Sequence, residues 1–194
     1  MAKIIGLTGG SGSGKSALAG FWRELGGHII DADAVYHRLL MENRDMVSEL
    51  AAAFPLAAQN NAVDRRILGK IVFQDGDALE RLGDITHKYV IRSIQKEIAG
   101  RRRARVLIVE AIYLIESGLG RLCGLTIAVT APYGERLSRV MARDGLDEEA
   151  ARLRLSRQKP DEFYIQNCDK VIRNHQGERE LLQQAETIWE ETLS

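Results

Sequence analysis

The chain has 194 residues, 45% of them hydrophobic and 28% charged, and its 27 Lys and Arg balance its 27 Asp and Glu. Such a composition is typical of an ordinary folded globule with one core, and zero net charge gives no general attraction to nucleic acid or anionic membranes. Two cysteines, Cys123 and Cys168, are too few for a disulfide framework or a four-ligand zinc site. No run approaches the roughly 18 apolar residues of a membrane span, and the apolar start is too short for a signal peptide. We therefore expect a cytoplasmic protein without nucleic-acid or membrane partners.

Trp22, Trp189 and Tyr113 suit a core or an interface, so a monomer or a weak homo-oligomer is expected.

Short apolar runs without polar alternation predict strands that are covered on both faces of a parallel sheet. Five such runs lie at residues 3–8, 28–31, 105–109, 125–130 and 169–173. Helical patterns separate them, and this alternation favours an α/β layer fold.

The spacing of the predicted strands indicates two insertions. About seventy residues separate the second strand from the third, several times the length of a minimal crossover. Helical patterns fill this interval at residues 35–40, 46–54, 64–73 and 78–98, and two more follow the fourth strand at 135–143 and 148–157, the last with Asp147 as its N-cap. We expect a core of residues 1–33, 101–134 and 166–194, a helical domain at 34–100 and a lid at 135–165.

Directly after the first strand, and ahead of a helical run, the sequence fits G-x-x-x-x-G-K-[ST] without a gap. Glycines let the backbone wrap a polyphosphate with its N–H groups inward, and the helix N-terminus adds positive potential. Lys15 can place a charge between the β- and γ-phosphates, and the Ser16 hydroxyl can ligate Mg²⁺. A flexible Gly/Ser loop would explain the glycines but not Lys15 and Ser16. The expected nucleotide contacts are Gly9, Gly10, Ser11, Gly12, Ser13, Gly14, Lys15, Ser16 and Ala17.

Other strings separate the classes of protein that use such a loop. The N-K-x-D and D-x-x-G strings of GTPases and the LSGGQ-like segment of transporter ATPases are absent, and the chain is small for a motor. A small-molecule kinase remains, in which a helical insertion holds the acceptor and an arginine-bearing lid closes over ATP.

Acidic residues end two of the predicted strands, at the sheet edge where α/β proteins bind ligands. Asp31 and Asp33 point to the same side of an extended strand end, where a carboxylate can take a proton from a hydroxyl or position Mg²⁺. The alternative is that Asp33 is the N-cap of a helix that starts at Ala34. Glu110 is either a Walker-B-like carboxylate for a magnesium-bound water or a simple strand end.

Three arginines of the predicted lid, Arg136, Arg139 and Arg143, share one helix face at i, i+3 and i+7. Aimed at a transferring phosphoryl group, they would neutralise the charge that builds in the transition state. The alternative is a solvated basic face.

Together these residues resemble the dephospho-CoA kinase family, nearly end to end. Besides the phosphate loop, the resemblance rests on Leu25-Gly26, Asp31-Ala32-Asp33, Asp64-Arg65, Val72-Phe73, His87, Glu116-Ser117-Gly118-Leu119, Arg139, Arg143-Asp144-Gly145, Gln158 and Asp169-x-Val171-Ile172-x-Asn174.

The resemblance implies a three-layer P-loop fold with a parallel five-stranded sheet, and ATP- and Mg²⁺-dependent phosphorylation of the 3′-hydroxyl of dephospho-CoA. It implies that Asp33 is the general base, that Lys15, Arg139 and Arg143 act on the phosphoryl group, and that Asn174 lies near the adenine. Arg136 has no match in the family's motif. The implied acceptor contacts are Asp33, Asp64, Arg65, His87 and Glu116. The metal contacts expected from the motif and the strand ends themselves are Ser16, Asp31 and Glu110.

The chain departs from the family pattern at Ser11, Pro55, Lys88, Ile112 and Tyr164. Most of these positions belong to the presumed acceptor domain and lid, whereas the residues for ATP chemistry are present. Two alternatives stay open: a P-loop kinase for another small acceptor, such as a nucleotide or sugar acid, and a non-catalytic nucleotide-binding sensor.

Overall fold

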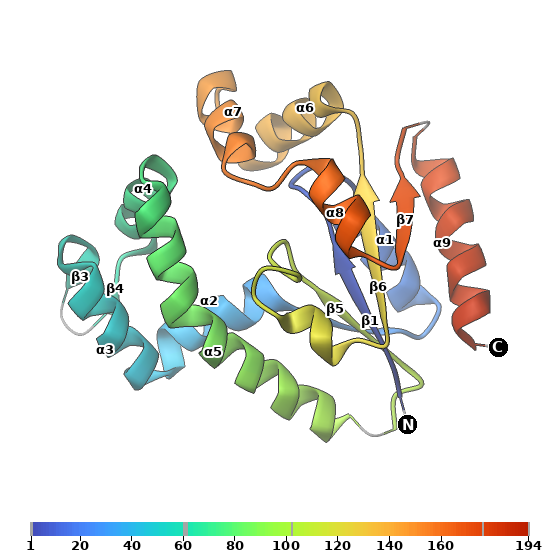
Figure 1. Ribbon diagram of the computed structural model, residues 1–194, viewed down its shortest axis with the longest axis horizontal. Helices are drawn as coiled ribbons and strands as arrows, with labels where there is room; N and C mark the ends of the chain where they lie inside the picture. Colours follow the sequence, from blue (N-terminus) through green and yellow to red (C-terminus); the bar gives the residue numbers. More distant parts are fainter. Residues whose placement is uncertain (1, 60–61, 102, 176, 194) are drawn as a thin grey trace. The chain divides into compact units, whose positions relative to one another are not determined.

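The computed structural model describes residues 2–59, 62–101, 103–175 and 177–193. The chain forms two compact units, one of residues 1–30 and 101–194 and the other of residues 31–100. The first contains the main sheet, and the second is mostly helical (Figure 1). Among the described residues, no helix combines the length and the apolarity needed to cross a membrane.

The first unit is built on a five-stranded sheet with the strand order β2-β5-β1-β6-β7. Its strands are β1 (Lys3–Thr8), β2 (His28–Asp31), β5 (Val106–Glu110), β6 (Leu125–Thr130) and β7 (Lys170–Arg173). β1 pairs in parallel with both β5 and β6, and β6 pairs in parallel with β7. The predicted α/β fold with five parallel strands is confirmed.

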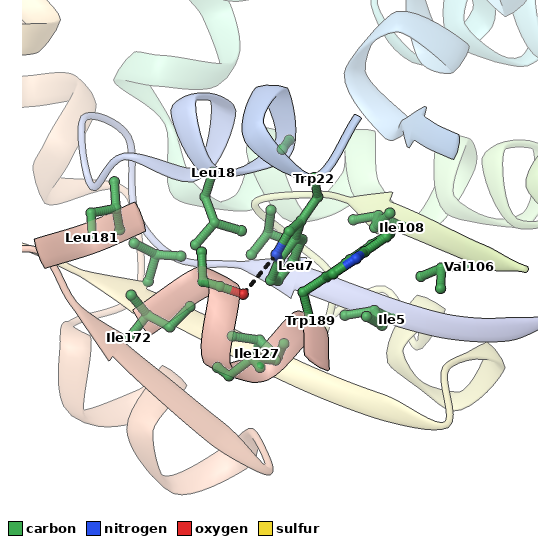
Figure 2. Packing of buried hydrophobic residues seen from close by; sticks show 14 residues of the cluster. Ile5, Leu7, Leu18, Trp22, Val106, Ile108, Ile127, Ile172, Leu181 and Trp189 are labelled. Carbon is green, nitrogen blue, oxygen red and sulfur yellow. Dashed lines mark hydrogen bonds between the residues drawn. The ribbon is translucent and has the colours of Figure 1, made fainter. Parts of the chain in front are cut away.

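One face of the sheet is covered by α1 (Lys15–Glu24) and α9 (Glu178–Leu193), which pack on apolar strand residues (Figure 2). Trp22 of α1 stacks on Trp189 of α9 with 6.4 Å between ring centroids, and its Nε1–H donates to the Ala185 carbonyl at 3.0 Å. Of the two roles left open for these tryptophans, the structure therefore shows the core. The strand side chains beneath them include Ile5, Leu7, Val106, Ile108, Ile127 and Ile172.

The chain after β5 packs near β1 and contains the 3₁₀ helix η2 (Leu119–Leu122). Gly6 of β1 allows this packing, because a Cβ on it would lie 2.7 Å from Leu114 Cδ2. The other helices of the first unit are α6 (Tyr133–Asp144), α7 (Glu148–Ser156) and α8 (Asp161–Asn167). The predicted cap of α7 is confirmed, since the Asp147 carboxylate accepts the Ala150 N–H at 2.8 Å.

The second unit packs α5 (Gly76–Gly100) against α2 (Ala32–Glu42), α3 (Arg44–Ala53) and α4 (Arg65–Gln74). Its buried side chains include Val35, Leu39, Met46, Leu50, Leu68, Val72, Val90 and Ile94. Sequence analysis missed the 3₁₀ helix η1 (Pro55–Ala57) and the short antiparallel pair of β3 (Ala58–Gln59) and β4 (Ala62–Val63), because two-residue strands show no period.

Asp169 fixes the start of β7 to the start of β6. Its Oδ2 accepts the hydroxyl and the backbone N–H of Thr126, both at 2.7 Å. The hydrogen bond from the Thr126 hydroxyl, and after it the one from the Thr126 N–H, lower the pKa of Asp169 below its ordinary value of 3.8. The motif residue Asp169 thus anchors the strand that ends beside Asn174.

Asp169→Asn keeps this shape but removes the charge. We expect the free energy of unfolding at pH 7 to fall by about 0.5 kcal/mol, since solvent screens an exposed carboxylate. A carboxyl with a lowered folded pKa contributes stability above its unfolded pKa, and that contribution is lost as the pH falls through the folded value. Urea unfolding should therefore show a difference between the wild type and the variant that shrinks below about pH 4. A difference that stays constant from pH 7 to pH 3 would contradict this role for the charge.

Candidate active site

The loop between β1 and α1 has the wrapped conformation that its motif predicts. Gly9, Gly12 and Gly14 have φ angles of 131°, 76° and 110°, a region that favours glycine. There is also no room for a side chain, because a Cβ at Gly9 would lie 2.1 Å from the Val129 carbonyl oxygen and one at Gly14 would lie 2.5 Å from Asn174 Nδ2. Conformation and space both require glycine here.

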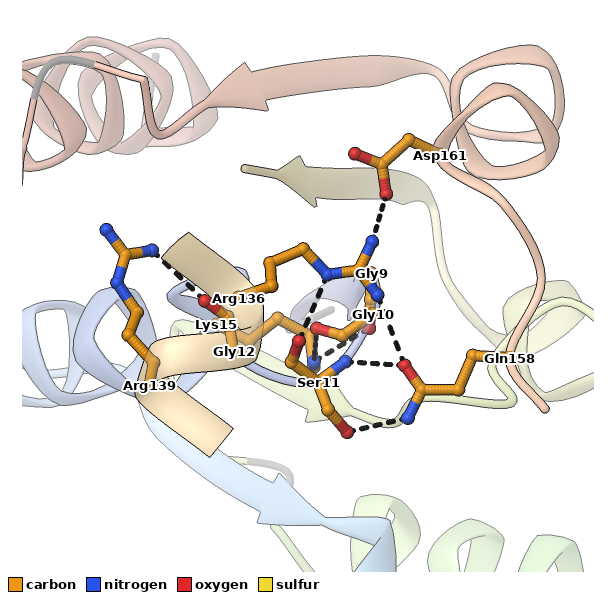
Figure 3. A network of polar contacts seen from close by, with 9 residues as sticks. All are labelled: Gly9, Gly10, Ser11, Gly12, Lys15, Arg136, Arg139, Gln158 and Asp161. Atoms are coloured by element: carbon orange, nitrogen blue, oxygen red, sulfur yellow. Dashed lines mark hydrogen bonds and ion pairs between the residues drawn. The ribbon is translucent and has the colours of Figure 1, made fainter. Parts of the chain in front are cut away.

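Lys15 and Ser16 occupy the first turn of α1. Lys15 is buried, and its Nζ donates to the carbonyl oxygens of Gly9 at 2.7 Å and Gly10 at 3.1 Å (Figure 3). The exposed Ser16 hydroxyl donates to Glu110 Oε1 at 3.0 Å, because β5 ends next to β1. The Ser16 hydroxyl and the Glu110 carboxylate thus place two oxygen atoms side by side, and oxygen atoms are the ligands that Mg²⁺ prefers. The described residues contain no cluster of three or more His, Cys, Asp or Glu for a metal.

Two further side chains donate hydrogen bonds to backbone carbonyl groups of the loop. Arg139 Nη1 donates to the Gly12 carbonyl at 3.0 Å, while its Nη2 pairs with Glu135 at 2.5 Å. Asn174 is 4% exposed, and its Nδ2 donates to the Ser13 carbonyl at 2.9 Å. Both predicted residues therefore contact the loop, and they do so through its backbone.

The three lid arginines have different surroundings. Arg136 is buried and pairs with Asp161 at 2.8 Å, so the alternative of a solvated basic face is wrong for this residue. Arg143 is more than half exposed and pairs with Asp144, also at 2.8 Å, and this hydrogen bond lowers the pKa of the Asp144 carboxyl. Sequence analysis placed the three residues on one helix face but had no signal for the burial of Arg136.

In the second unit, the N-cap of α2 is Asp31. Its Oδ1 accepts the N–H groups of Asp33 at 2.8 Å and Ala34 at 3.1 Å. The alternative that Asp33 caps a helix starting at Ala34 is therefore wrong, because α2 already begins at Ala32. The Asp33 side chain lies exposed in the first turn of α2, so the cap does not require it.

His37 and Arg65 lie on the same unit as Asp33 and form a pair. Arg65 Nη2 lies 2.6 Å from His37 Nε2, and since a guanidinium only donates, this imidazole nitrogen accepts. Burial first, and then the Arg65 charge, lower the pKa of His37, whereas Asp33 and Asp31 act in the opposite direction. Burial also raises the pKa of Tyr36 to about 12, with Asp33 among the charges that act on it. Sequence analysis missed Tyr36 and His37, although their i+3 and i+4 spacing from Asp33 was an available signal.

The remaining predicted acceptor residues differ in position. Asp64 is the N-cap of α4, and its Oδ1 accepts the Arg66 N–H at 2.8 Å, so this residue fixes the start of the helix that carries Arg65. His87 lies half-buried on α5, and burial lowers its pKa. Glu116 belongs to the first unit, and burial raises the pKa of its carboxyl.

Four of the departures from the family pattern have different surroundings. Lys88 pairs with Glu49 at 2.6 Å on the surface of the second unit. Pro55 starts the 3₁₀ helix η1, a first-turn position that needs no backbone N–H. Tyr164 is completely buried. The backbone carbonyl of Ile112 accepts a hydrogen bond from the Thr8 hydroxyl at 3.1 Å. These four residues leave the contacts of Lys15 and Ser16 in place.

Comparison with known proteins identifies the family. The family model described as dephospho-CoA kinase matches residues 3–180. A dephospho-CoA kinase of Moorella thermoacetica is 38% identical over 174 residues, which cover 87% of this chain and 82% of that relative. A solved Thermus thermophilus structure aligns with a TM-score of 0.84 and 35% identity, covering 100% of this chain and 98% of the other. Dephospho-CoA kinase from Campylobacter jejuni aligns with a TM-score of 0.68 and 29% identity, covering 98% and 97%. The chain therefore belongs to the dephospho-CoA kinase family and is a small-molecule kinase that uses ATP.

Proposed function

We propose that this chain transfers the γ-phosphoryl group of ATP to the 3′-hydroxyl of dephospho-CoA, giving coenzyme A and ADP. The family match over residues 3–180 supports the reaction, and the observation that carries the chemistry is the buried Lys15 on a glycine-lined loop beside Ser16 and Glu110. We further propose that the enzyme is cytoplasmic and works as a monomer or weak homo-oligomer.

On the ATP side, backbone N–H groups of the loop and the Lys15 ammonium bind the β- and γ-phosphates. Arg139 and Arg143 then neutralise the charge that develops on the transferring group. Ser16 would hold Mg²⁺ directly and Glu110 through water, and the bound ion would neutralise phosphate charge. Asp31 is a weaker ligand candidate, because its Oδ1 already caps α2.

On the acceptor side, Asp33 takes the proton of the 3′-hydroxyl as general base. Arg65 brings a positive charge to the same unit, which suits the diphosphate of dephospho-CoA. Asp64 caps α4, the helix that carries Arg65, and His37 accepts a hydrogen bond from Arg65. His87 and Glu116 are proposed as further acceptor contacts from the family resemblance alone.

An ADP-release assay with a panel of acceptors tests this function. We expect kcat/KM for dephospho-CoA to exceed that for nucleoside monophosphates and sugar acids by at least about 100-fold. EDTA should abolish turnover and added Mg²⁺ should restore it. Turnover with another acceptor alone would support a different small-molecule kinase, and ATP binding without turnover on any acceptor would support a sensor.

A further inference from the structure

Ser11 of the phosphate loop is held on both sides by residues from α6 and from the segment between α7 and α8 (Figure 3). Its N–H donates to Gln158 Oε1 at 2.8 Å, and Gln158 Nε2 donates back to the Ser11 hydroxyl at 2.7 Å. Its carbonyl accepts Arg136 Nε at 3.1 Å. Every polar group of Ser11 therefore has a partner outside the loop.

The guanidinium of Arg136 connects these contacts. Besides Nε on Ser11, its Nη1 donates to Asp161 at 2.8 Å and its Nη2 donates to Gln158 Oε1 at 3.3 Å. The residue is 6% exposed, and a charge buried this deeply requires a paired acid and satisfied hydrogen bonds. The planar fork of arginine can serve three acceptors at once, which the point charge of a lysine does not reproduce.

The loop sequence itself makes room for Arg136. Gly10 and Gly12 occupy x positions of G-x-x-x-x-G-K-[ST], so the motif does not require glycine at either. A Cβ at Gly10 would lie 1.9 Å from Arg136 Nη2, and one at Gly12 would lie 2.6 Å from the Arg136 carbonyl oxygen. Both glycines thus allow α6 and its arginine to lie directly on the loop.

We propose that Arg136 is a positioning residue for the phosphate loop, which acts through Ser11 and is oriented by Asp161 and Gln158. Arg136 holds the outward carbonyl of Ser11, so that the following N–H groups keep the direction in which they bind phosphate. This inference rests on the proposed binding of ATP by the loop, and it adds a residue that the family motif does not contain. Its signature is a selective loss of nucleotide affinity, because the hydrogen bonds of Arg136 go to Ser11, Asp161 and Gln158 and not to the proposed acceptor contacts.

Arg136→Gln and Arg136→Lys test the proposal, with Arg152→Gln as the matched control. Arg152 is an exposed arginine of α7 that pairs with Glu148, so Arg152→Gln removes the same charge as Arg136→Gln without touching the loop. We expect both Arg136 variants to raise the Kd of ATP by about 10-fold, and the control to leave it within about twofold. The KM for dephospho-CoA should stay within about twofold in all three variants.

Calorimetry of ATP binding needs no acceptor, so it separates this proposal from the assignment of dephospho-CoA as substrate. Asp161→Asn and Gln158→Ala provide variants in case Arg136→Gln does not fold, and each should raise the Kd of ATP by about threefold or more. In folded variants with a Tm near that of the wild type, an unchanged Kd of ATP would overturn the proposal. A wild-type Kd of ATP in Arg136→Lys would also overturn the proposal. An equal rise in the KM for ATP and the KM for dephospho-CoA would overturn it as well.

Discussion

Asp33→Asn is expected to lower kcat by at least about 100-fold while leaving the Kd of ATP within about twofold. The amide keeps the shape of the side chain but does not accept a proton from the 3′-hydroxyl. The fold should tolerate the change, because Asp31 is the residue that caps α2, and Asp33 is exposed in its first turn. ADP release gives kcat, and calorimetry gives the Kd of ATP.

Asp45→Asn is the matched control for this variant. Asp45 is an exposed aspartate in the first turn of α3, in the same unit, so the substitution removes an equal charge from an equivalent helix position. It should keep wild-type turnover. Near-normal turnover of Asp33→Asn would mean that Asp33 is not the base.

Lys15→Ala is expected to lower kcat/KM for ATP by about 1000-fold. The substitution removes the buried ammonium that we propose binds the β- and γ-phosphates. It also removes the donor to the carbonyl oxygens of Gly9 and Gly10, so the loop loses part of its own support. Initial rates at saturating acceptor measure the effect, and circular dichroism checks the fold.

The control here is Lys96→Ala, an exposed lysine of α5 in the other unit. It should show wild-type rates, because the charge of an exposed lysine is screened by water and salt. A loss of less than about tenfold in Lys15→Ala would show that the loop does not use this lysine in phosphoryl transfer.

Sequence analysis predicted the parts of this protein that depend on local pattern. Each strand of the main sheet contains a short apolar run, reduced in β7 to Val171-Ile172, and the phosphate loop is a gapless motif between a strand and a helix. Asp147 was identified as a cap because three local features coincide: an acid, two glutamates after it and a helical run. At Asp31-Ala32-Asp33 the sequence analysis considered only Asp33 as a cap, whereas Asp31 caps α2, because β2 ends at Asp31 and α2 begins at Ala32.

The contacts that sequence analysis missed join residues far apart in the chain. Arg136 meets Asp161, and Arg65 meets His37, each across more than twenty residues. Each pair depends on how two helices pack against each other. Hydrophobic periodicity indicates which face of a helix is buried, but not which helix packs on that face. The role of Gly10 and Gly12 was hidden for the same reason, because the arginine that needs their space lies on α6.

The position of the transferred phosphate tests the central claim most directly. Purified protein, MgATP and dephospho-CoA are incubated, and the product is examined by phosphorus NMR. We predict one new phosphomonoester on the 3′-oxygen of the ribose, formed in equal amount with ADP. Release of inorganic phosphate alone, or a phosphate at any other position, would contradict the account.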